Sequence, residues 1–371
     1  MVLEGHLGWA IVALAGPSML SMMLAVVGGM MSALFLGRIV GTIGLALAAS
    51  IAAVELCVSV VFQALANGTM SLLSREIGAG SERAGRIVQS SLLLTALVGC
   101  VLCVLGLALC DPLSVLLSDN ADLQPLLRAY LIGLAFATTP VGLATVGIAI
   151  FAAAGWAQVA FWRGIVEIVL LAVLTPLFID QLGVIGAPLA QCVASCAAIA
   201  WMAWTLWTGW TDLRLGVRPS KLFVADRGVW RSIAKIGGPP QIGRLTNFVA
   251  FGFIVGLVLR ESAMLAAAFG VAYRLLTVAS TAGYGFSRAQ AIIAGQCIGA
   301  GKHDRAIASL WVACMLALIV GLALIVLAPL ATPLVRLFTT DVRVVAATMD
   351  ALASWRWIVL AASAWYIFLA A

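Results

Sequence analysis

The chain uses one apolar pattern twice. Gly16-Pro17 opens an apolar passage that closes at Gly78-Ala79-Gly80, and Gly238-Pro239 opens a second one that closes at Gly299-Ala300-Gly301. The offset between the copies is 222 residues at their start and 221 at their end. In each copy, two apolar segments long enough to be helices precede the Gly-rich corner. Self-similarity of this kind in apolar sequence is typical of transporters built by duplication.

The composition places these apolar segments in a membrane. Hydrophobic residues make up 64% of the chain and charged residues 10%, whereas a soluble domain has about 45 to 50% and about 25%. Since a helix crosses the bilayer with about 20 apolar residues, we predict an all-α integral membrane protein, a polytopic helical bundle. The predicted helices span residues 10–36, 44–70, 87–110, 128–153, 161–179, 184–210, 236–259, 263–287 and 306–330, and a tenth begins at 351.

A polar interruption divides the predicted helices into two groups. Residues 211–235 carry six Lys or Arg residues and two Asp residues. We predict an N-terminal six-helix lobe over residues 1–210, a cytoplasmic linker over 211–235, and a C-terminal lobe of about four helices over 236–371. Only 15 residues, apolar except for Ser363, follow from Trp357 to the last residue, so we expect this second lobe to be incomplete.

Basic residues predict the orientation. With the N-terminus placed in the cytoplasm, thirteen loop-sorted Lys and Arg residues, Arg288 among them, fall inside and six fall outside. This bias favours a multi-pass protein of the cell membrane with a cytoplasmic N-terminus. Six helices precede the linker, so the second repeat enters from the same face as the first and the repeats are parallel. The formal charge of +6 then reports orientation, and no nucleic-acid partner is expected.

The order of several short motifs resembles one transporter family. The motifs are Leu14-Ala15-Gly16-Pro17, the segment from Gly41 to Ala49, Ile77-Gly78-Ala79-Gly80, and Ala266-Ala267-Ala268-Phe269-Gly270. In this order and spacing they resemble the multidrug and toxic compound extrusion (MATE) transporters. The resemblance implies two six-helix lobes around a V-shaped cleft. It also implies export of amphipathic, often cationic compounds in exchange for H+ or Na+.

The chain departs from that family where charges are expected. Ser32 stands where the family commonly has an aspartate in the first helix. Leu171 and Thr175 stand where many members have the asparagine and aspartate of the fifth helix, and Asn247 where some have a glutamate in the seventh. The resemblance therefore implies that the usual cation site of the N-terminal lobe is not present in its usual form.

Charged residues inside predicted spans are the first candidates for the transport pathway. A charge at the bilayer centre costs about 2.5 to 3.5 kcal/mol, so such residues are commonly functional. Glu55 and Arg274 each lie 11 residues from the start of their helix, at Gly44 and Ala263, which is about 16 Å deep. They are either a substrate-contacting or cation-responsive pair, or a static ion pair that docks the two lobes.

Three further candidates lie nearer the ends of the spans. Glu167 lies one turn before Leu171, where it would be placed to carry a proton, but Arg163 one turn earlier favours a static ion pair. Arg244 and Asn247 lie one turn apart in the seventh predicted helix. They would either face the substrate cavity or bridge neighbouring helices by hydrogen bonds.

Secondary active export of small amphipathic organic compounds by alternating access is the preferred function. The alternatives are flipping of lipid-linked saccharides, as in related flippases, and a non-transporting truncated remnant. An enzyme is not expected, because no nucleophile or metal-ligand constellation is visible. We expect no cofactor beyond the coupling ion, H+ or Na+, and no metal site. The expected partners are a small organic substrate and the lipid bilayer, and the expected state is a monomer.

Overall fold

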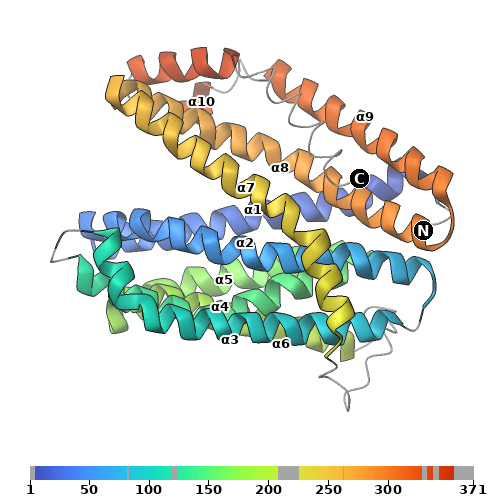
Figure 1. Ribbon diagram of the computed structural model, residues 1–371. Helices are drawn as coiled ribbons and strands as arrows, with labels where there is room; N and C mark the ends of the chain where they lie inside the picture. Colours follow the sequence, from blue (N-terminus) through green and yellow to red (C-terminus); the bar gives the residue numbers. More distant parts are fainter. Residues whose placement is uncertain are drawn as a thin grey trace. The chain divides into compact units, whose positions relative to one another are not determined.

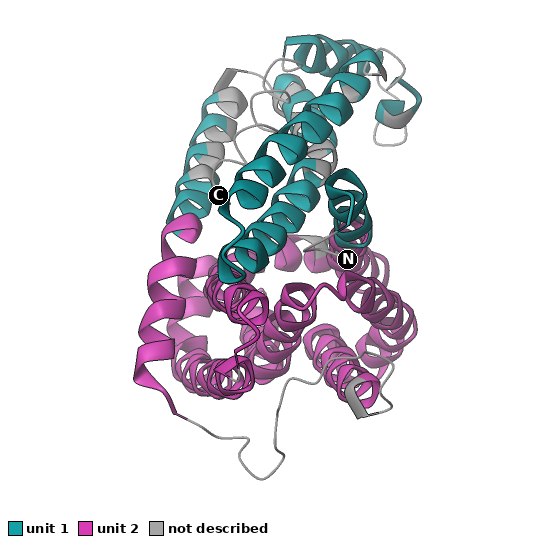
Figure 2. Cartoon of the chain, turned by 90° about the vertical axis from the view of Figure 1, so that its right-hand side faces the viewer, with its two compact units in different colours: residues 1–19, 242–371 teal, residues 20–241 magenta. Residues whose placement is uncertain are grey.

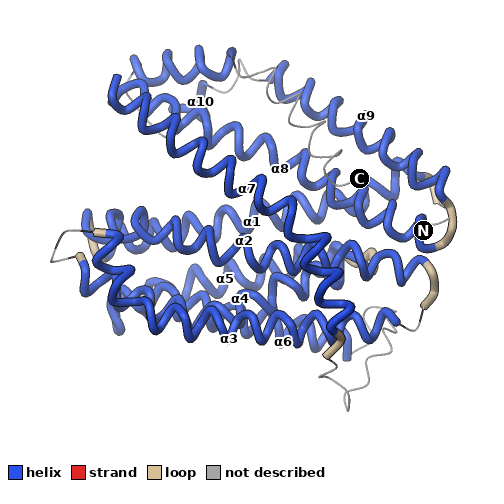
Figure 3. The backbone as a smooth tube through the Cα atoms, in the orientation of Figure 1, coloured by secondary structure: helices blue, strands red, loops and turns tan. Residues whose placement is uncertain are grey.

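The described part of the chain is helical. The computed structural model describes residues 5–81, 83–118, 120, 123–207, 225–261, 263–327, 332–336 and 342–354. Within them the helices are joined by short loops and no strand occurs (Figure 3). The helices are α1 (Leu7–Ile39), α2 (Thr42–Gly78), α3 (Arg83–Leu117), α4 (Gln124–Ala153), α5 (Ala157–Leu182), the 3-10 turn η1 (Gly183–Ile185), α6 (Gly186–Trp207), α7 (Arg227–Glu261), α8 (Ala263–Gly299), α9 (His303–Leu327) and α10 (Thr332–Arg336). Residues 342–354 are also helical.

The predicted bundle of apolar helices is confirmed. By length and composition, stretches long and apolar enough to cross a membrane lie at residues 7–39, 46–78, 83–117, 124–153, 157–205 and 303–323. The chain is therefore an all-α membrane protein. Several helices are longer than the apolar segments predicted from the sequence, because the polar residues that flank those segments are also helical. Such a helix continues until a residue such as glycine ends it. Arg288, expected in a cytoplasmic loop, consequently lies inside α8.

The two Gly-rich corners have the same backbone structure. After α2, Gly80 N–H donates to the Ile77 carbonyl and Ser81 N–H to the Glu76 carbonyl. After α8, Gly301 N–H donates to Ile298 and Lys302 N–H to Cys297, again 221 residues later. Gly80 and Gly301 have φ of 64° and 73°, which only glycine adopts at no steric cost. The duplication seen in the sequence is thus repeated bond for bond at the ends of two long helices.

The helix α7 begins earlier than predicted. Its first turn is capped by Asp226, whose Oδ1 accepts hydrogen bonds from Gly228 N–H and Val229 N–H. Trp230 Nε1–H donates to the Ser90 carbonyl and ties this turn to α3. The last part of the predicted linker is therefore helix, while residues 211–224 lie outside the described part. A polar sequence can still be helical when it is capped and packed along one face.

The chain divides into two compact units, coloured separately in Figure 2. One contains residues 20–241, and the other contains residues 1–19 and 242–371. The division falls inside α1 and inside α7, in each case shortly after the Gly-Pro pair, and the two positions are again 222 residues apart. The beginning of α1 thus belongs to the unit that contains α8, whereas α2, the next helix of its repeat, belongs to the unit of residues 20–241. The beginning of α7 belongs to the unit that contains α2, whereas α8, the next helix of its repeat, belongs to the other unit.

The unit of residues 20–241 is built around α4, which packs against α2, α3, α5 and α6. Close approach is possible because small residues lie at the contacts: a Cβ on Gly142 would lie 2.2 Å from the Phe62 ring of α2. The first turns of α7 pack on α2 in the same way, since a Cβ on Gly237 would lie 1.8 Å from the Ala64 carbonyl oxygen. The register of α2 on its neighbours is therefore fixed by side-chain shape.

The unit of residues 1–19 and 242–371 contains α8 packed along α9, as Figure 1 shows. The start of α1 joins it. Gly285 of α8 lies against Met19, and the Arg305 guanidinium donates to the Gly5 carbonyl. These contacts place the polar second half of α8 in a packed environment, where Gln290 and Gln296 are buried.

Candidate functional site

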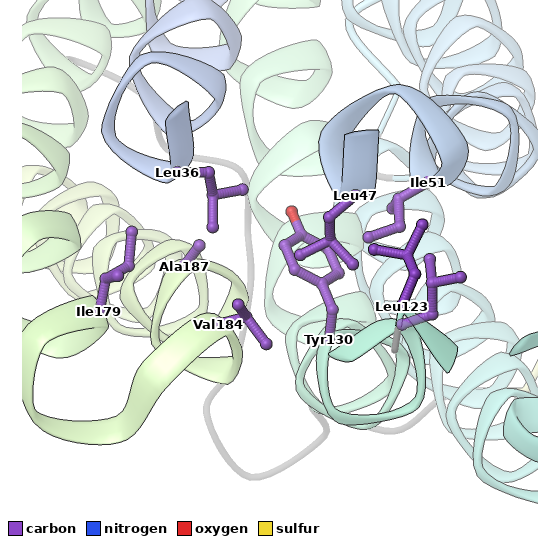
Figure 4. Packing of buried hydrophobic residues seen from close by; sticks show 9 residues of the cluster. Leu36, Leu47, Ile51, Leu123, Tyr130, Ile179, Val184 and Ala187 are labelled. Carbon is purple, nitrogen blue, oxygen red and sulfur yellow. The ribbon is translucent and has the colours of Figure 1, made fainter. Parts of the chain in front are cut away.

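Glu55 is paired with a tyrosine. Tyr130 of α4 donates its hydroxyl to Glu55 Oε1 of α2 at 2.9 Å. The Tyr130 ring is buried among apolar side chains that include Leu47, Ile51 and Leu123 (Figure 4). The carboxyl group lies at the edge of this cluster, since Glu55 itself is exposed on α2. Tyr130 was not among the residues predicted from the sequence, and its one signal was a phenol in a predicted span whose other polar residues are Arg128 and three threonines.

The expected pair of Glu55 with Arg274 stays a prediction. Arg274 lies in α8, in the other compact unit, and its side chain is outside the described part of the structure. The same holds for the side chain of Asn247 in α7, whereas Arg244 is exposed on that helix. Glu55 has a hydrogen-bond partner within its own unit, so its placement needs no charge from the other one.

A second polar site joins α5 to α6. Arg163 and Glu167 form the expected ion pair one helical turn apart, and their side chains are only 12% and 15% exposed. Glu167 Oε1 also accepts a hydrogen bond from Gln191 Nε2 of α6 at 2.8 Å, and the same nitrogen lies 3.3 Å from Ser195 Oγ. Arg163, Glu167, Gln191 and Ser195 are called the α5–α6 network below.

The positions of the missing family charges lie next to this network. Leu171 is buried and packs against Ala190 and Ala194 of α6. Thr175 is fully buried, and its hydroxyl has no hydrogen-bond partner among the described residues. Gly28 of α1 lies against Leu171, and Ser32, one turn further along α1, is half-buried. These positions offer the hydroxyls of Thr175 and Ser32 and otherwise apolar surface, with no carboxylate, which is a poor ligand set for a cation.

The described residues offer no constellation for metal chemistry. Among them, no group of three or more His, Cys, Asp or Glu side chains is close enough to hold a metal ion. All eight cysteines are free thiols. The described polar groups of the two sites in the unit of residues 20–241 are therefore carboxylates, an amide, hydroxyls and the Arg163 guanidinium, set among apolar helices.

Comparison with known proteins identifies the family. A family model described as MatE matches residues 17–177 and 243–370, which is most of the chain. The chain belongs to the MatE family. MATE proteins are transporters and not enzymes, so the predicted absence of enzymatic activity agrees with this membership. None of the curated proteins compared with the chain matches it.

Solved structures of MATE transporters share the fold. A multidrug resistance MATE transporter of the MOP superfamily in an outward-facing conformation matches with a TM-score of 0.90 and 21% identity, over 100% of this chain and 84% of that one. A MATE protein in the straight conformation matches with a TM-score of 0.89 and 22% identity, over 100% and 84%. A MOP superfamily transporter from Pyrococcus furiosus, described as having a binding pocket of reverse polarity, matches with 0.88 and 21%, over 100% and 84%. At these identities the likeness shows the fold.

Proposed function

We propose that this MATE protein exports small amphipathic organic compounds across the cell membrane in exchange for H+ or Na+. Family membership supports export, and alternating access of the two repeats would supply the mechanism. The observation that carries the coupling is the presence of two carboxylates, Glu55 and Glu167, away from the ends of apolar helices that could cross a membrane. Since a charge there costs about 2.5 to 3.5 kcal/mol, such residues are kept where they have a task.

The two carboxylates are suited to different tasks. Glu167 is neutralised by Arg163 and held by Gln191, so little net charge is left to attract a cation. Its network links α5 to α6 and serves best as a structural contact. Glu55 is held by a neutral phenol and has no counter-charge among the described residues. Glu55 is therefore the better candidate for the group that responds to the coupling ion.

Transport by the purified chain tests this proposal. In proteoliposomes loaded with a fluorescent organic cation, an inward gradient of H+ or Na+ should accelerate efflux, and collapse of that gradient with an ionophore should remove the acceleration. Liposomes without protein are the control. Efflux that is the same with and without either gradient would show that export is not ion-coupled.

We also propose that the protein is a monomer and that its N-terminus lies in the cytoplasm. A cysteine at Ser220, which lies outside the described residues, tests the orientation in a background with reactive native cysteines removed. The basic residues around it predict a cytoplasmic position, so an impermeant thiol reagent added outside intact cells should leave it unmodified. Modification from outside would reverse the topology.

A further inference from the structure

Polar side chains are spaced at a constant interval along α2. Between Ile51 and Gly68 the polar residues of this helix are Glu55, Ser59, Gln63 and Asn67, each four positions after the last. Ser71 and Arg75 continue the interval, and the six residues are called the α2 polar stripe. Side chains four apart on a helix are neighbours, about 5 to 6 Å apart at Cβ. From first to last the stripe covers about 30 Å, the thickness of the hydrocarbon core.

Each member of the stripe keeps some open surface. Glu55, Ser59 and Arg75 are exposed, while Gln63, Asn67 and Ser71 are half-buried. With 3.6 residues per turn, the stripe drifts by about 40° at each step. It begins beside the face that Ile51 and Phe62 bury. The stripe thus lies at the edge of the packed helices, and neighbouring helices do not bury its side chains completely.

The exposed side of α2 around Glu55 lacks the composition of a lipid-facing surface. Its exposed side chains include Ala46, Ala49, Ala52 and Ala53, which are small. A carboxylate within a span faces the bundle interior or a water-filled cavity, because hydrocarbon does not solvate it. The open side of Glu55 and of the stripe is therefore the side on which water reaches α2.

We propose that Glu55 is the proton-coupling group of this transporter and that the α2 polar stripe is its path to the aqueous phase at the Arg75 end. The proposal rests on the ion-coupled export proposed above and adds the residue, the ion and the route. The proton binds one oxygen of the Glu55 carboxylate and changes its charge from negative to neutral. When the carboxyl group releases the proton, the proton returns along the stripe to the aqueous phase.

A proton fits this site better than a sodium ion does. Bound metal cations need several oxygen ligands, and in transporters the backbone supplies many of them where helices unwind. Both α2 and α4 are continuous helices past Glu55 and Tyr130, so their carbonyls are used in helix hydrogen bonds. Among the described residues one carboxylate and one phenol remain, which suit a proton better than the several oxygen ligands of a sodium site.

Few titratable or charged groups would compete with Glu55 for this proton. Among the described residues, the one that faces it from a neighbouring helix is Tyr130 of α4. Asp111 of α3 and Arg128 of α4 pair with each other. Cys57 lies on α2 itself and is exposed. The charge of Glu55 therefore has no described counter-ion, unlike that of Glu167.

The second repeat keeps part of the stripe but not the carboxylate. At the offset of 221 that aligns the Gly-rich corners, Tyr284 and Arg288 of α8 correspond to Gln63 and Asn67, and Leu276 corresponds to Glu55. Both copies of the repeat thus have polar residues at these two positions. The carboxylate is specific to the first copy, which assigns proton coupling to one unit.

Cysteine accessibility tests the path without any need for transport. In a chain without reactive native cysteines, S59C, Q63C and N67C are compared with V104C, which replaces a residue of α3 that is 65% exposed. A small water-soluble thiol reagent added to inside-out vesicles should modify the stripe cysteines at least about tenfold faster, because reaction needs a hydrated thiolate. Stripe cysteines as slow as V104C would overturn the path.

Carbodiimide labelling tests the site itself. In membranes that contain the unmodified chain, Glu55 should be labelled, with labelling that falls as pH rises, because the reagent attacks protonated carboxyls. Glu167, paired with Arg163, is the internal control and should remain unlabelled. Absence of label on Glu55 at every pH, found by mass spectrometry, would overturn the assignment.

Coupling is then measured with Glu55→Gln. This variant should still exchange substrate between two equal pools but lose acceleration by a proton gradient. Unchanged acceleration would overturn the proposal, and E55D provides a second carboxylate variant if E55Q gives little folded protein. If the unmodified chain shows no gradient-driven export, the proposed function fails, while accessibility and labelling still decide whether the stripe leads water to Glu55.

Discussion

The exposed faces of α2 and α3 differ although the two helices are neighbours in one unit. In the middle of α3, between residues 97 and 109, most of the exposed side chains are large and aliphatic: Leu97, Val101, Val104, Leu105 and Leu109. On α2, Ile43 is the one exposed large apolar side chain described, and the other exposed residues are Ala, Ser, Cys and Glu, with Arg75 near the end of the helix. Both helices are apolar by composition, so hydropathy alone does not separate them.

The difference indicates which surface of this unit contacts lipid and which contacts water. Aliphatic side chains on an open face are suited to hydrocarbon, and small or polar ones are suited to a pathway that water or substrate enters. We therefore place the lipid boundary along α3 and the transport pathway along α2. The predictions below would break or sharpen this distinction, beginning with the largest effect.

A new charge separates the two faces most strongly. Val104→Asp puts a carboxylate on the open face of α3, where an uncompensated charge costs about 3 kcal/mol in the bilayer. Ala53→Asp puts the same charge on the open face of α2, where water would solvate it. Folded yield and melting temperature in detergent-free membranes should fall sharply for the first and little for the second. Equal losses would mean that both faces contact lipid.

The next prediction concerns whether Glu55, on the open face of α2, pairs with Arg274 of the second repeat. If Glu55 and Arg274 pair in one conformation, each single change to Gln leaves a charge without its partner, while the double change removes both. The coupling energy from folded yield should then be about 0.5 to 3 kcal/mol. The double variant should recover yield but not gradient-driven export.

The outcome of that cycle distinguishes three cases. Recovery of both yield and export would make the pair a static docking contact. Losses that simply add would show that Glu55 and Arg274 are not coupled. In that case Tyr130 is the relevant partner of Glu55, and Tyr130→Phe should have no further effect on export in a Glu55→Gln background.

Most of the fold could be predicted from the sequence because its signals are local. Runs of apolar residues predict the spans, and the Gly-rich corners predict the ends of α2 and α8, where φ must be positive. The start of α7 was missed. Asp226 is a local capping signal, but the segment around it is polar, and the Trp230 contact with Ser90, 140 residues away in the chain, leaves no local pattern.

The candidate site was only half predictable for the same reason. Glu55 and Glu167 stand out because a charge in an apolar run is conspicuous in one sequence. Their partners do not. Tyr130 is 75 residues from Glu55, and Gln191 is 24 from Glu167. Which side chains meet depends on the register of packed helices, which shape complementarity such as Phe62 against Gly142 determines.

The smallest effect is expected where the lipid-facing side of α3 ends. Asp111 lies seven residues after Val104 and hence on the same side of the helix, two turns further along. It pairs with Arg128, and both side chains are more than half exposed. Because water solvates both charges, the pair adds little to stability.

Asp111→Asn should therefore leave the melting temperature and folded yield unchanged within measurement scatter, in contrast to Val104→Asp on the same side of the same helix. The matched control is Arg128→Gln, which removes the other member of the pair and should behave alike. A marked loss in either variant would place Asp111 inside the hydrocarbon region. The lipid boundary on α3 would then extend at least two turns beyond Val104, and the contrast with α2 would have to be drawn over the whole length of both helices.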